Sequence, residues 1–267
     1  MFKKLFLKKN RALLSELVRT DFKLRYQGSV LGYAWSLLRP LFMFVILYIV
    51  FVKFIKLGAG IPHLPIYLLL GIVLWNFFNE MTVQSLTSIV GRGDLIRKIK
   101  IPRWIIVFSS SISALINFLL NLVVVAVFLV VNHVGLHASA LWLVLIVVEI
   151  YILALGLSLF LSAAYVKYHD VIYIWEVAMQ AGFYLTPILY QLSSISNLTF
   201  QKILMISPMA QAIQDARFQV VTHQTRTIYQ VFTGSWHELT PFALVIIIFI
   251  GGLAYFRKES KYFAENV

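Results

Sequence analysis

Six long apolar runs constrain this chain more than any other feature of its sequence. They lie near residues 37–55, 65–84, 104–131, 140–166, 171–190 and 239–256. A helix needs about 20 mostly apolar residues to cross the hydrocarbon core of a membrane. Hydrophobic residues make up 60% of the 267 positions and charged residues 13%, and no polar stretch is long enough for a separate soluble domain. The sequence therefore predicts an all-α integral membrane protein with six transmembrane helices in residues 37–256.

The distribution of lysine and arginine predicts the orientation of the chain. When the six runs are taken to cross in turn, 18 of the 23 basic residues fall on one side. Cytoplasmic loops carry an excess of lysine and arginine, so we expect the N-terminal segment, residues 1–36, and the tail, residues 257–267, in the cytoplasm. The formal net charge is +12, and the cations flank apolar segments. Membrane lipid with anionic headgroups is therefore a simpler partner than nucleic acid.

The segment before the first run has the pattern of an amphipathic helix that lies in a membrane interface. Apolar residues recur at helical spacing, and cations fall on another face. These residues are Leu14, Leu17, Val18 and Phe22, and Arg11, Arg19 and Lys23. Gly28 and Gly32 lie four residues apart, which would let a helix or a headgroup approach the backbone closely. From the residues alone, a basic anchor that only orients the protein explains the pattern.

The run from Asp21 to Gly32, followed by Trp35 and Pro40, resembles the N-terminal signature of ABC-2 type permeases. The similar subgroup exports lipid-linked polysaccharides and wall teichoic acids, including O-antigen and rhamnose-rich polymers. The resemblance implies that an interface helix leads here into the first span and forms part of an entrance or gate. The residues that it implicates are Asp21, Phe22, Lys23, Arg25, Tyr26, Gly28, Ser29, Gly32, Trp35 and Pro40.

The segment 191–238 lies between the last two runs, and we expect it on the outer side. Its apolar piece, residues 203–206, is too short to span, so re-entrant or interfacial helices and a soluble outer cap both fit its composition. The resemblance favours re-entrant helices, because residues 207–217 are similar to the family's Asn-Pro-Leu…Glu-x-x-Arg region. Ser207 and Asp215 depart from the commonest residues of that region, so no role is assigned to them.

The loop 91–104 carries five basic residues between the second and third runs. Asp94 is expected to cap a short helix over residues 95–101, and Pro102 to end it. A plain positively charged cytoplasmic loop explains the charges, whereas the resemblance implies a coupling helix that seats in a groove of an ATPase subunit. The expected coupling residues, with a second contact in the 167–170 turn, are Asp94, Leu95, Arg97, Lys98, Lys100, His169 and Asp170.

Four polar residues of the third run recur three or four positions apart and form one stripe on a helix. Hydrogen bonding between helices is the commoner role of such residues, and a pore lining is the alternative. In the fifth run, Tyr184 is poorly placed for an interfacial belt and could stack on sugar rings. The expected pathway residues are Ser110, Ser113, Asn117, Asn121 and Tyr184.

Three carboxylates lie within the runs, namely Glu80, Glu149 and Glu176. A charge at mid-membrane costs about 2.5–3.5 kcal/mol on insertion scales, so each needs a partner, water or a proton. Glu80 and Glu176 lie toward the inner ends of their runs, whereas Glu149 is deeper. A proton relay is an unfavoured interpretation, because the three acids are scattered and have no basic partner inside the runs.

Several functional classes lack their sequence marks. No Gly-x-x-x-x-Gly-Lys-Ser/Thr loop is present, so ATP and Mg²⁺ are expected on a separate ATPase subunit. There is no cysteine, and His133 and His137 are interpreted as solvated loop residues rather than metal ligands. A membrane-embedded transferase would want an Asp-x-Asp pair, and an ion-coupled carrier often shows inverted repeats, but neither is visible. The sequence therefore predicts no catalytic residue, no metal site and no cofactor in this chain.

The resemblance implies a permease that forms a homodimer and pairs with two copies of an ABC ATPase subunit. Its substrate would be an undecaprenyl-diphosphate-linked polysaccharide or teichoic acid, moved outward across the plasma (inner) membrane of a bacterium. The alternatives are an ABC-2 exporter of another lipid or small molecule, and a membrane-embedded glycosyl or phosphoglycosyl transferase.

Overall fold

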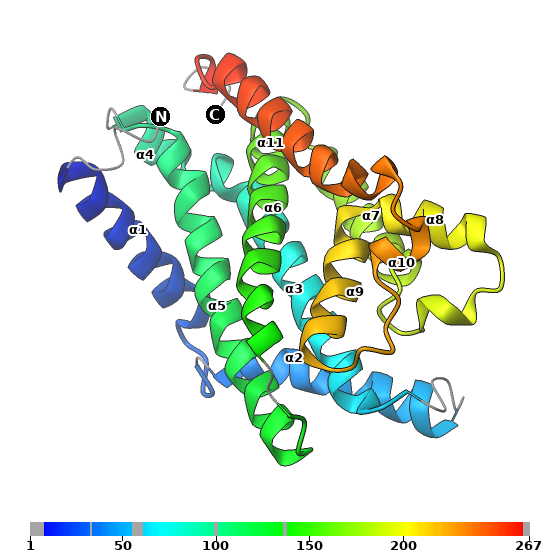
Figure 1. The fold of residues 1–267 in the computed structure, drawn as a ribbon. Helices are drawn as coiled ribbons and strands as arrows, with labels where there is room; N and C mark the ends of the chain where they lie inside the picture. Colours follow the sequence, from blue (N-terminus) through cyan, green and yellow to red (C-terminus); the bar gives the residue numbers. More distant parts are fainter. Residues whose placement is uncertain (1–7, 33, 55–60, 99–100, 136–137, 264–267) are drawn as a thin grey trace.

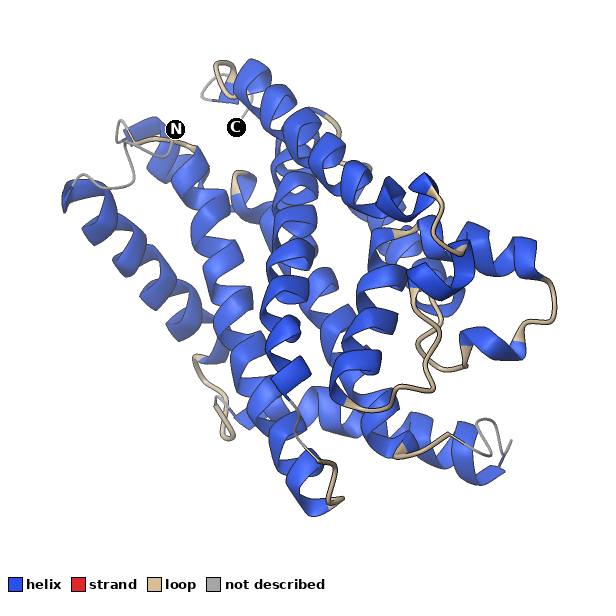
Figure 2. Cartoon of the chain, in the orientation of Figure 1, coloured by secondary structure: helices blue, strands red, loops and turns tan. Residues whose placement is uncertain are grey.

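The computed structural model describes residues 8–32, 34–54, 61–98, 101–135 and 138–263. Within these ranges the chain is helical and contains no strand (Figures 1 and 2), which confirms the expected all-α fold. Five helices in the described ranges are long and apolar enough to cross a membrane. They are Ala34–Phe54 (α2, Ala34–Leu47, continued by a π-helix), α3 (Leu64–Ser88), α5 (Trp104–Val131), Ala138–Lys167 (a 3-10 turn followed by α6, Trp142–Lys167) and Trp236–Glu259 (a 3-10 turn followed by α11, Thr240–Glu259).

The run expected to span at 171–190 forms the shorter apolar helix α7 (Val171–Leu185), which has 15 residues. The helix ends because Thr186 is extended, with φ −72° and ψ 136°, immediately before Pro187. A proline disfavours helical geometry in the residue before it and has no backbone N–H of its own. At 1.5 Å per residue α7 rises about 22 Å, which is less than the roughly 30 Å of a hydrocarbon core.

The helix α3 lies at the centre of the bundle. In its most apolar stretch 78% of the residues are buried, against 17% for Ala34–Phe54 and 22% for Trp236–Glu259. It packs against α2, α5, α6, α7 and α9 (Pro208–Val220). The ring of Phe77 stacks on that of Phe118 from α5, with 4.4 Å between the ring centroids. Because so many helices cover α3, its polar residues face protein rather than lipid.

Small residues set the crossing of α6 and α11, which pack closely together. A Cβ atom on Gly252 would collide with the carbonyl oxygen of Gly156, and one on Gly156 would meet the backbone of Phe249. Glycine at a crossing lets two helix backbones approach within the membrane, where packing rather than the hydrophobic effect drives association.

The helix α1 (Lys8–Tyr26) precedes the first span, as the amphipathic pattern predicts, and packs against α5. Leu17 on α1 is buried, whereas Arg19 and Lys23 are exposed. The chain then turns through Gly28 and Gly32, whose φ angles of +77° and +48° lie in the left-handed region that glycine favours. No other described part of the chain comes within 4 Å of a Cβ built at either glycine. Both glycines therefore serve the turn, and the backbone beside them is not covered by any described part of this chain.

Between α7 and α11 the chain forms three short helices, α8 (Leu198–Ile206), α9 (Pro208–Val220) and α10 (Ile228–Phe232). α9 begins at Pro208, which suits the first position of a helix because the backbone N–H there has no partner. It packs against α3 and α6 (Figure 1), and nine of its 13 residues are buried. This part of the segment 191–238 therefore belongs to the bundle and is not a separate soluble cap.

Arg217 on α9 is completely buried, at 0% exposure, and ties three segments together. Its guanidinium donates to the carbonyl oxygens of Tyr67 (2.9 Å), Pro187 (2.6 Å) and Ile188 (2.6 Å). It also lies 3.7 Å from the centre of the Tyr67 ring, and a Cβ atom at Gly71 would collide with it. Burying a charge is costly unless hydrogen bonds compensate. These contacts supply that compensation and satisfy two carbonyl groups freed where α7 ends.

Replacing Arg217 by methionine should destabilise the protein severely. The variant removes three hydrogen bonds from a charged donor to buried carbonyl oxygens, although Pro187 keeps a second donor in Gln214 Nε2 at 3.2 Å. A hydrogen bond to a charged group is worth about 1.5–3 kcal/mol. We expect a lower melting temperature and a loss of the monodisperse species, measured on detergent-solubilised protein by thermal shift and size-exclusion chromatography. Arg257→Met, which removes an exposed arginine, is the matched control. Equal melting temperatures for the two variants would contradict the role given to Arg217.

The helix α4 (Gly93–Lys98) and the C-terminal end of α11 lie at one end of the bundle (Figure 1). The excess of lysine and arginine predicts that this end is cytoplasmic. Because the chain has no cysteine, single cysteines can report its topology. In intact cells we expect an impermeant thiol reagent to label Ser196→Cys and to leave Lys258→Cys unlabelled until the cells are opened. The reverse labelling pattern would overturn the orientation.

Candidate functional site

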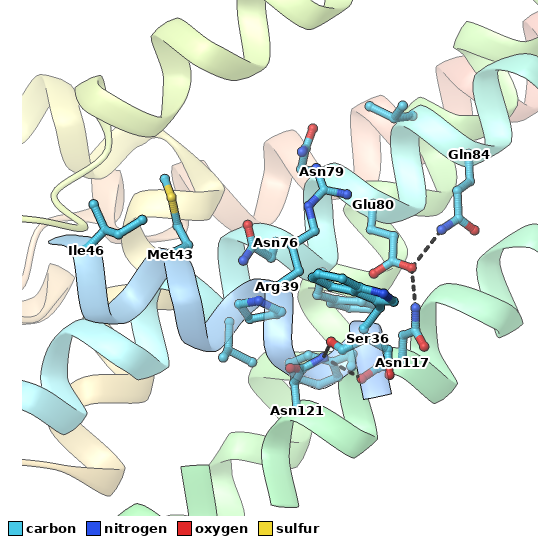
Figure 3. Close-up of a pocket in the computed structure, with 16 residues that line it drawn as sticks. Ser36, Arg39, Met43, Ile46, Asn76, Asn79, Glu80, Gln84, Asn117 and Asn121 are labelled. Atoms are coloured by element: carbon cyan, nitrogen blue, oxygen red, sulfur yellow. Dashed lines mark hydrogen bonds between the residues drawn. The ribbon is translucent and has the colours of Figure 1, made fainter. Parts of the chain in front are cut away.

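A cavity of about 690 Å³ lies between α2, α3 and α5 (Figure 3). Eight of its 16 lining residues are polar or charged, which is unusual for a space between apolar helices. These eight are Ser36, Arg39, Asn76, Asn79, Glu80, Gln84, Asn117 and Asn121. The cavity is therefore a polar site within the helices expected to lie in the membrane.

Helical periodicity brings these side chains to one place. On α3, Asn76, Asn79 and Glu80 are three and four residues apart, and on α5 Asn117 and Asn121 are four apart. Residues at these spacings lie on one face of a helix. The two polar faces meet across the cavity, and α2 supplies a third wall (Figure 3).

The carboxylate of Glu80 joins α3 to α5. Its Oε1 accepts hydrogen bonds from Gln84 Nε2 (2.7 Å) and Asn117 Nδ2 (2.6 Å), as Figure 3 shows. The other amide atom of Asn117, Oδ1, is buried and makes no hydrogen bond. Two side-chain amides that donate to one oxygen fix the position of the Glu80 carboxyl group. The site therefore holds an anchored carboxyl group beside an amide oxygen without a donor.

A second set of hydrogen bonds joins α5 to α2. Asn121 Nδ2 donates to the carbonyl oxygens of Ser36 (3.3 Å) and Asn117 (2.8 Å). The carbonyl of Ser36 lies near the start of α2, so this amide fixes the position of the third wall. The polar network thus holds all three helices around the cavity.

Aromatic rings cover other parts of the wall, namely those of Trp35, Phe77 and Phe118. The amides offer both donors and acceptors, and the guanidinium of Arg39 adds a cation. A wall of apolar rings with a few convergent polar groups is typical of a binding site for a small molecule or a section of a longer one. The combination suits a ligand with many hydroxyl groups and apolar C–H faces.

The structure separates the residues expected to line a pathway. Asn117 and Asn121 line the cavity. Ser110 and Ser113 are buried and donate to the carbonyl oxygens of Ile106 (3.3 Å) and Ser109 (3.0 Å) on their own helix. Serine often bonds to the carbonyl one turn back, which removes the hydroxyl from other partners. Tyr184 on α7, the fifth of the expected residues, is 59% exposed and does not line the cavity.

Two of the expected gate residues, Trp35 and Pro40, also line the cavity. Asp21 on α1 forms an ion pair with Arg92, which follows α3, and Arg92 donates to Ser109 Oγ on α5 at 3.1 Å. This pair attaches α1 to the bundle near the loop that carries α4.

The other expected gate residues lie in α1 and in the turn after it. Phe22 is half-buried and Lys23 is exposed. Ser29 Oγ accepts a hydrogen bond from the N–H of Gly32 at 3.2 Å, which closes the turn. The structure describes only the backbone of Arg25 and Tyr26, which belong to the last turn of α1.

The short helix α4 carries most of the expected coupling residues. It begins at Gly93, so Asp94 lies in its first turn and does not cap it as expected. Asp94 instead pairs with Arg97 at 3.3 Å on the surface. Leu95 is half-buried, Ile96 is buried and Lys98 is exposed. The helix therefore anchors itself by apolar residues and presents its charged side chains outward.

The remaining coupling residues lie elsewhere. Lys100 falls outside the described residues. His169 and Asp170 are exposed in the turn between α6 and α7, and the ring of His169 lies 5.1 Å from that of Tyr165.

Sequence reasoning missed several cavity residues, namely Arg39, Asn76, Asn79 and Gln84. The spacing of Asn76, Asn79 and Glu80 within an apolar run was the available signal, because polar residues three and four apart mark a face that avoids lipid. Among the residues that the structure describes, no group of three or more histidine, aspartate or glutamate side chains could hold a metal ion.

Comparisons with known proteins show which family and which relatives this chain is similar to. The model of the ABC-2 type transporter family matches residues 12–218. An O-antigen export system permease protein RfbA of Klebsiella pneumoniae is 30% identical over 254 residues, which cover 95% of this chain and 94% of the relative. A second RfbA protein from Klebsiella pneumoniae is 29% identical over 257 residues, covering 95% and 94% of the two chains. The RfbA protein of Myxococcus xanthus is 24% identical over 260 residues, covering 96% of each.

Proposed function

Because this chain belongs to the ABC-2 type transporter family, we propose that it is the membrane permease of an ATP-driven polysaccharide exporter. The observation that carries the proposal is the polar cavity between α2, α3 and α5, in a chain that is similar over nearly its whole length to O-antigen export permeases. The family and the apolar helices make it a multi-pass inner membrane protein. The finer statements below concern its substrate, partners and orientation.

The chemistry of the cavity favours a neutral, hydroxyl-rich polymer over a teichoic acid. Sugar hydroxyls both donate and accept hydrogen bonds, as do the amides of Asn76, Asn79 and Asn117. The anchored carboxylate of Glu80 accepts hydrogen bonds from hydroxyl groups but repels phosphate groups. Among the described residues that line the cavity, Arg39 is the one cation. A chain of neutral sugars can therefore slide past these groups, whereas a polyphosphate meets a fixed negative charge.

The lipid carrier is proposed to be undecaprenyl diphosphate, bound on the cytoplasmic side. The exposed cations of α1, such as Arg19 and Lys23, suit a diphosphate headgroup at the membrane surface. The turn at Gly28 and Gly32 leads from α1 directly to Trp35 on the cavity wall. An entrance at this turn would connect the headgroup site to the path of the sugars.

We further propose that two copies of this chain enclose the path. The helix α2 forms one wall of the polar cavity, yet only 17% of its most apolar stretch is buried within this chain. A second copy across a two-fold axis would cover α2 and widen the space, and two-fold dimers are the commonest oligomers. The short helices of 191–238 would then form a re-entrant layer on the outer side, where their backbone is covered by protein.

The energy of transport is assigned to a separate ATPase subunit, one for each permease copy. The sequence has no phosphate-binding loop of its own. The helix α4 and the turn with His169 and Asp170 offer exposed polar surfaces for such a partner. ATP and Mg²⁺ would bind to that partner and not to this chain.

Changing Asn117 to leucine should reduce polysaccharide export about tenfold or more. The variant removes a donor to Glu80 and a polar group from the cavity, and a lost hydrogen bond to a charged group is worth about 1.5–3 kcal/mol. Surface polysaccharide and intracellular lipid-linked precursor would be measured in cells whose own permease gene is deleted. Asn132→Leu is the matched control, because Asn132 also bonds to α5 but lies outside the cavity. Equal export by both variants, with equal protein levels, would refute the assignment of the cavity.

Reversing the charges of Arg97 and Lys98 on α4 should uncouple transport. Both side chains are exposed, so Arg97→Glu with Lys98→Glu should leave the fold intact while it repels an ATPase groove that suits cations. We expect weaker copurification of the ATPase subunit and a matching loss of export. The control is Arg257→Glu with Lys258→Glu, an exposed basic pair on α11. Unchanged copurification and export in the α4 variant would leave the loop as a topology signal only.

A further inference from the structure

A second polar cluster lies between α6 and α9, outside the cavity. It consists of Glu149 from α6 and Gln211 and Asp215 from α9. Gln211 Nε2 donates to Asp215 Oδ2 at 2.7 Å, and the same amide is close to the carboxyl group of Glu149. The two carboxyl groups are near enough to interact electrostatically. The proposed transport function uses none of the three side chains.

Each of these side chains has one buried oxygen without a hydrogen-bond partner. The three atoms are Glu149 Oε1, Gln211 Oε1 and Asp215 Oδ1. Gln211 is 1% exposed, so water does not reach its amide from the surface. The donors present are the Gln211 amide and the backbone N–H of Ile228, which bonds to Asp215. Buried polar groups are normally paired, so three unpaired acceptors in one place indicate that a positively charged species or donor belongs there.

Charge balance identifies that species. Two adjacent carboxylates cannot both be ionised cheaply in a buried site. Arg217 lies two residues beyond Asp215 on the same helix, and its hydrogen bonds go to carbonyl oxygens and not to a carboxylate. A carboxyl pair that holds one proton has a charge of −1, which offsets the guanidinium. A divalent cation at the pair would instead leave a net positive charge beside Arg217, and an empty pair a net negative one.

We propose that Glu149 and Asp215 bind one proton in common and that this proton fastens α9 to α6. The protonated oxygen becomes a donor to an unpaired oxygen of the other carboxyl group, which pairs two of the three unpaired oxygens. The proposal does not depend on what the permease carries. Its consequence is that the attachment of α9, and with it the segment between α7 and α11, responds to pH.

The other titratable groups on the helices packed against α9 bond to other partners or lie away from Glu149 and Asp215. On α3, Tyr67 faces Arg217 and Glu80 faces the cavity. On α6, Tyr151 bonds to Ser111. Lys202 of α8 lies over the Phe232 ring at 5.9 Å. The remaining titratable groups of the helices packed against α9 are exposed or lie toward the C-terminal ends of α6 and α11; they are Tyr165, Lys167, Tyr229, Tyr255, Arg257, Lys258 and Glu259.

The environment of Asp215 supports the proposed binding of a proton. The helix α9 is too short, at 13 residues, to cross a membrane. Burial raises the pKa of the Asp215 carboxyl to about 6, although hydrogen bonds from Gln211 and from the backbone of Ile228 act in the opposite direction. A folded protein that binds a proton more tightly than the unfolded chain is stabilised at low pH. That stabilisation is lost as the pH rises from the ordinary value of about 3.9 through the raised value.

The test is the melting temperature of the full-length protein in detergent as a function of pH. For the wild type we expect the melting temperature to fall as the pH rises through about 6. Glu149→Gln replaces one of the two acids by an amide of the same shape, which can donate to Asp215 without a bound proton, so it should keep the higher melting temperature at alkaline pH. Glu176→Gln, which changes an exposed carboxylate on α7, should behave as the wild type. An unchanged pH dependence in Glu149→Gln would overturn the proposal.

Two further measurements guard against a variant that simply folds poorly. Infrared difference spectra of the wild type should show the carbonyl stretch of a buried protonated acid. The band should be absent in Glu149→Gln and in Asp215→Asn but present in Glu176→Gln. Melting temperatures in sodium and in choline chloride at constant pH should agree. A wild type without the band, or one whose melting temperature follows sodium, would show that a shared proton is not what fills the cluster.

Discussion

The buried guanidinium of Arg217 is the interaction on which the second half of the structure depends. Backbone carbonyl groups in lipid need hydrogen-bond donors. A helix can therefore end inside a bundle only where another group donates to the carbonyl oxygens that the helix no longer pairs. Pro187 ends α7 early, and Arg217 donates to the carbonyl oxygens of Pro187 and Ile188. The same guanidinium reaches Tyr67 on α3, the most buried helix. Without this cation, the segment between α7 and α11 would lose three hydrogen bonds that tie it to α3 and to the end of α7, and would keep only the packing of its short helices.

Hydropathy predicted most of the fold because the membrane fixes the length of a spanning helix, and that length can be read directly from the sequence. The early end of α7 could be read from Thr186 and Pro187. Which group would pair the carbonyl oxygens freed there could not be read from the sequence. Arg217 and Tyr67 are 150 residues apart in the chain, and no local pattern shows that a cation in one segment will meet carbonyl oxygens in another. For the same reason Gly71 could not be recognised as the position that leaves space for that guanidinium.

The spacing of polar residues within the apolar runs was the one sequence signal for the candidate site. The stripe on the third run led to Asn117 and Asn121, whereas the similar spacing of Asn76, Asn79 and Glu80 on the second run was not used. Within the stripe, the length and hydrogen-bonding groups of each side chain decided whether it lines the cavity. A serine hydroxyl can reach its own helix backbone, and Ser110 and Ser113 do so, which leaves no hydroxyl proton to donate to a ligand. A longer asparagine amide reaches across to other helices.

The helix α3 contributes to two polar centres, the contacts of Arg217 and the cavity around Glu80. The two centres differ in how easily a ligand could replace their hydrogen bonds. Tyr67 and Gly71 belong to the Arg217 centre, where one guanidinium donates to three backbone carbonyl oxygens. Glu80, about 20 Å further along the helix, is held by the side-chain amides of Gln84 and Asn117. Ligand hydroxyls can replace such amides at little cost, because both donate to the same carboxylate oxygen. A ligand in the cavity should therefore loosen the contact between α3 and α5 while the contact between α3 and α9 stays fixed.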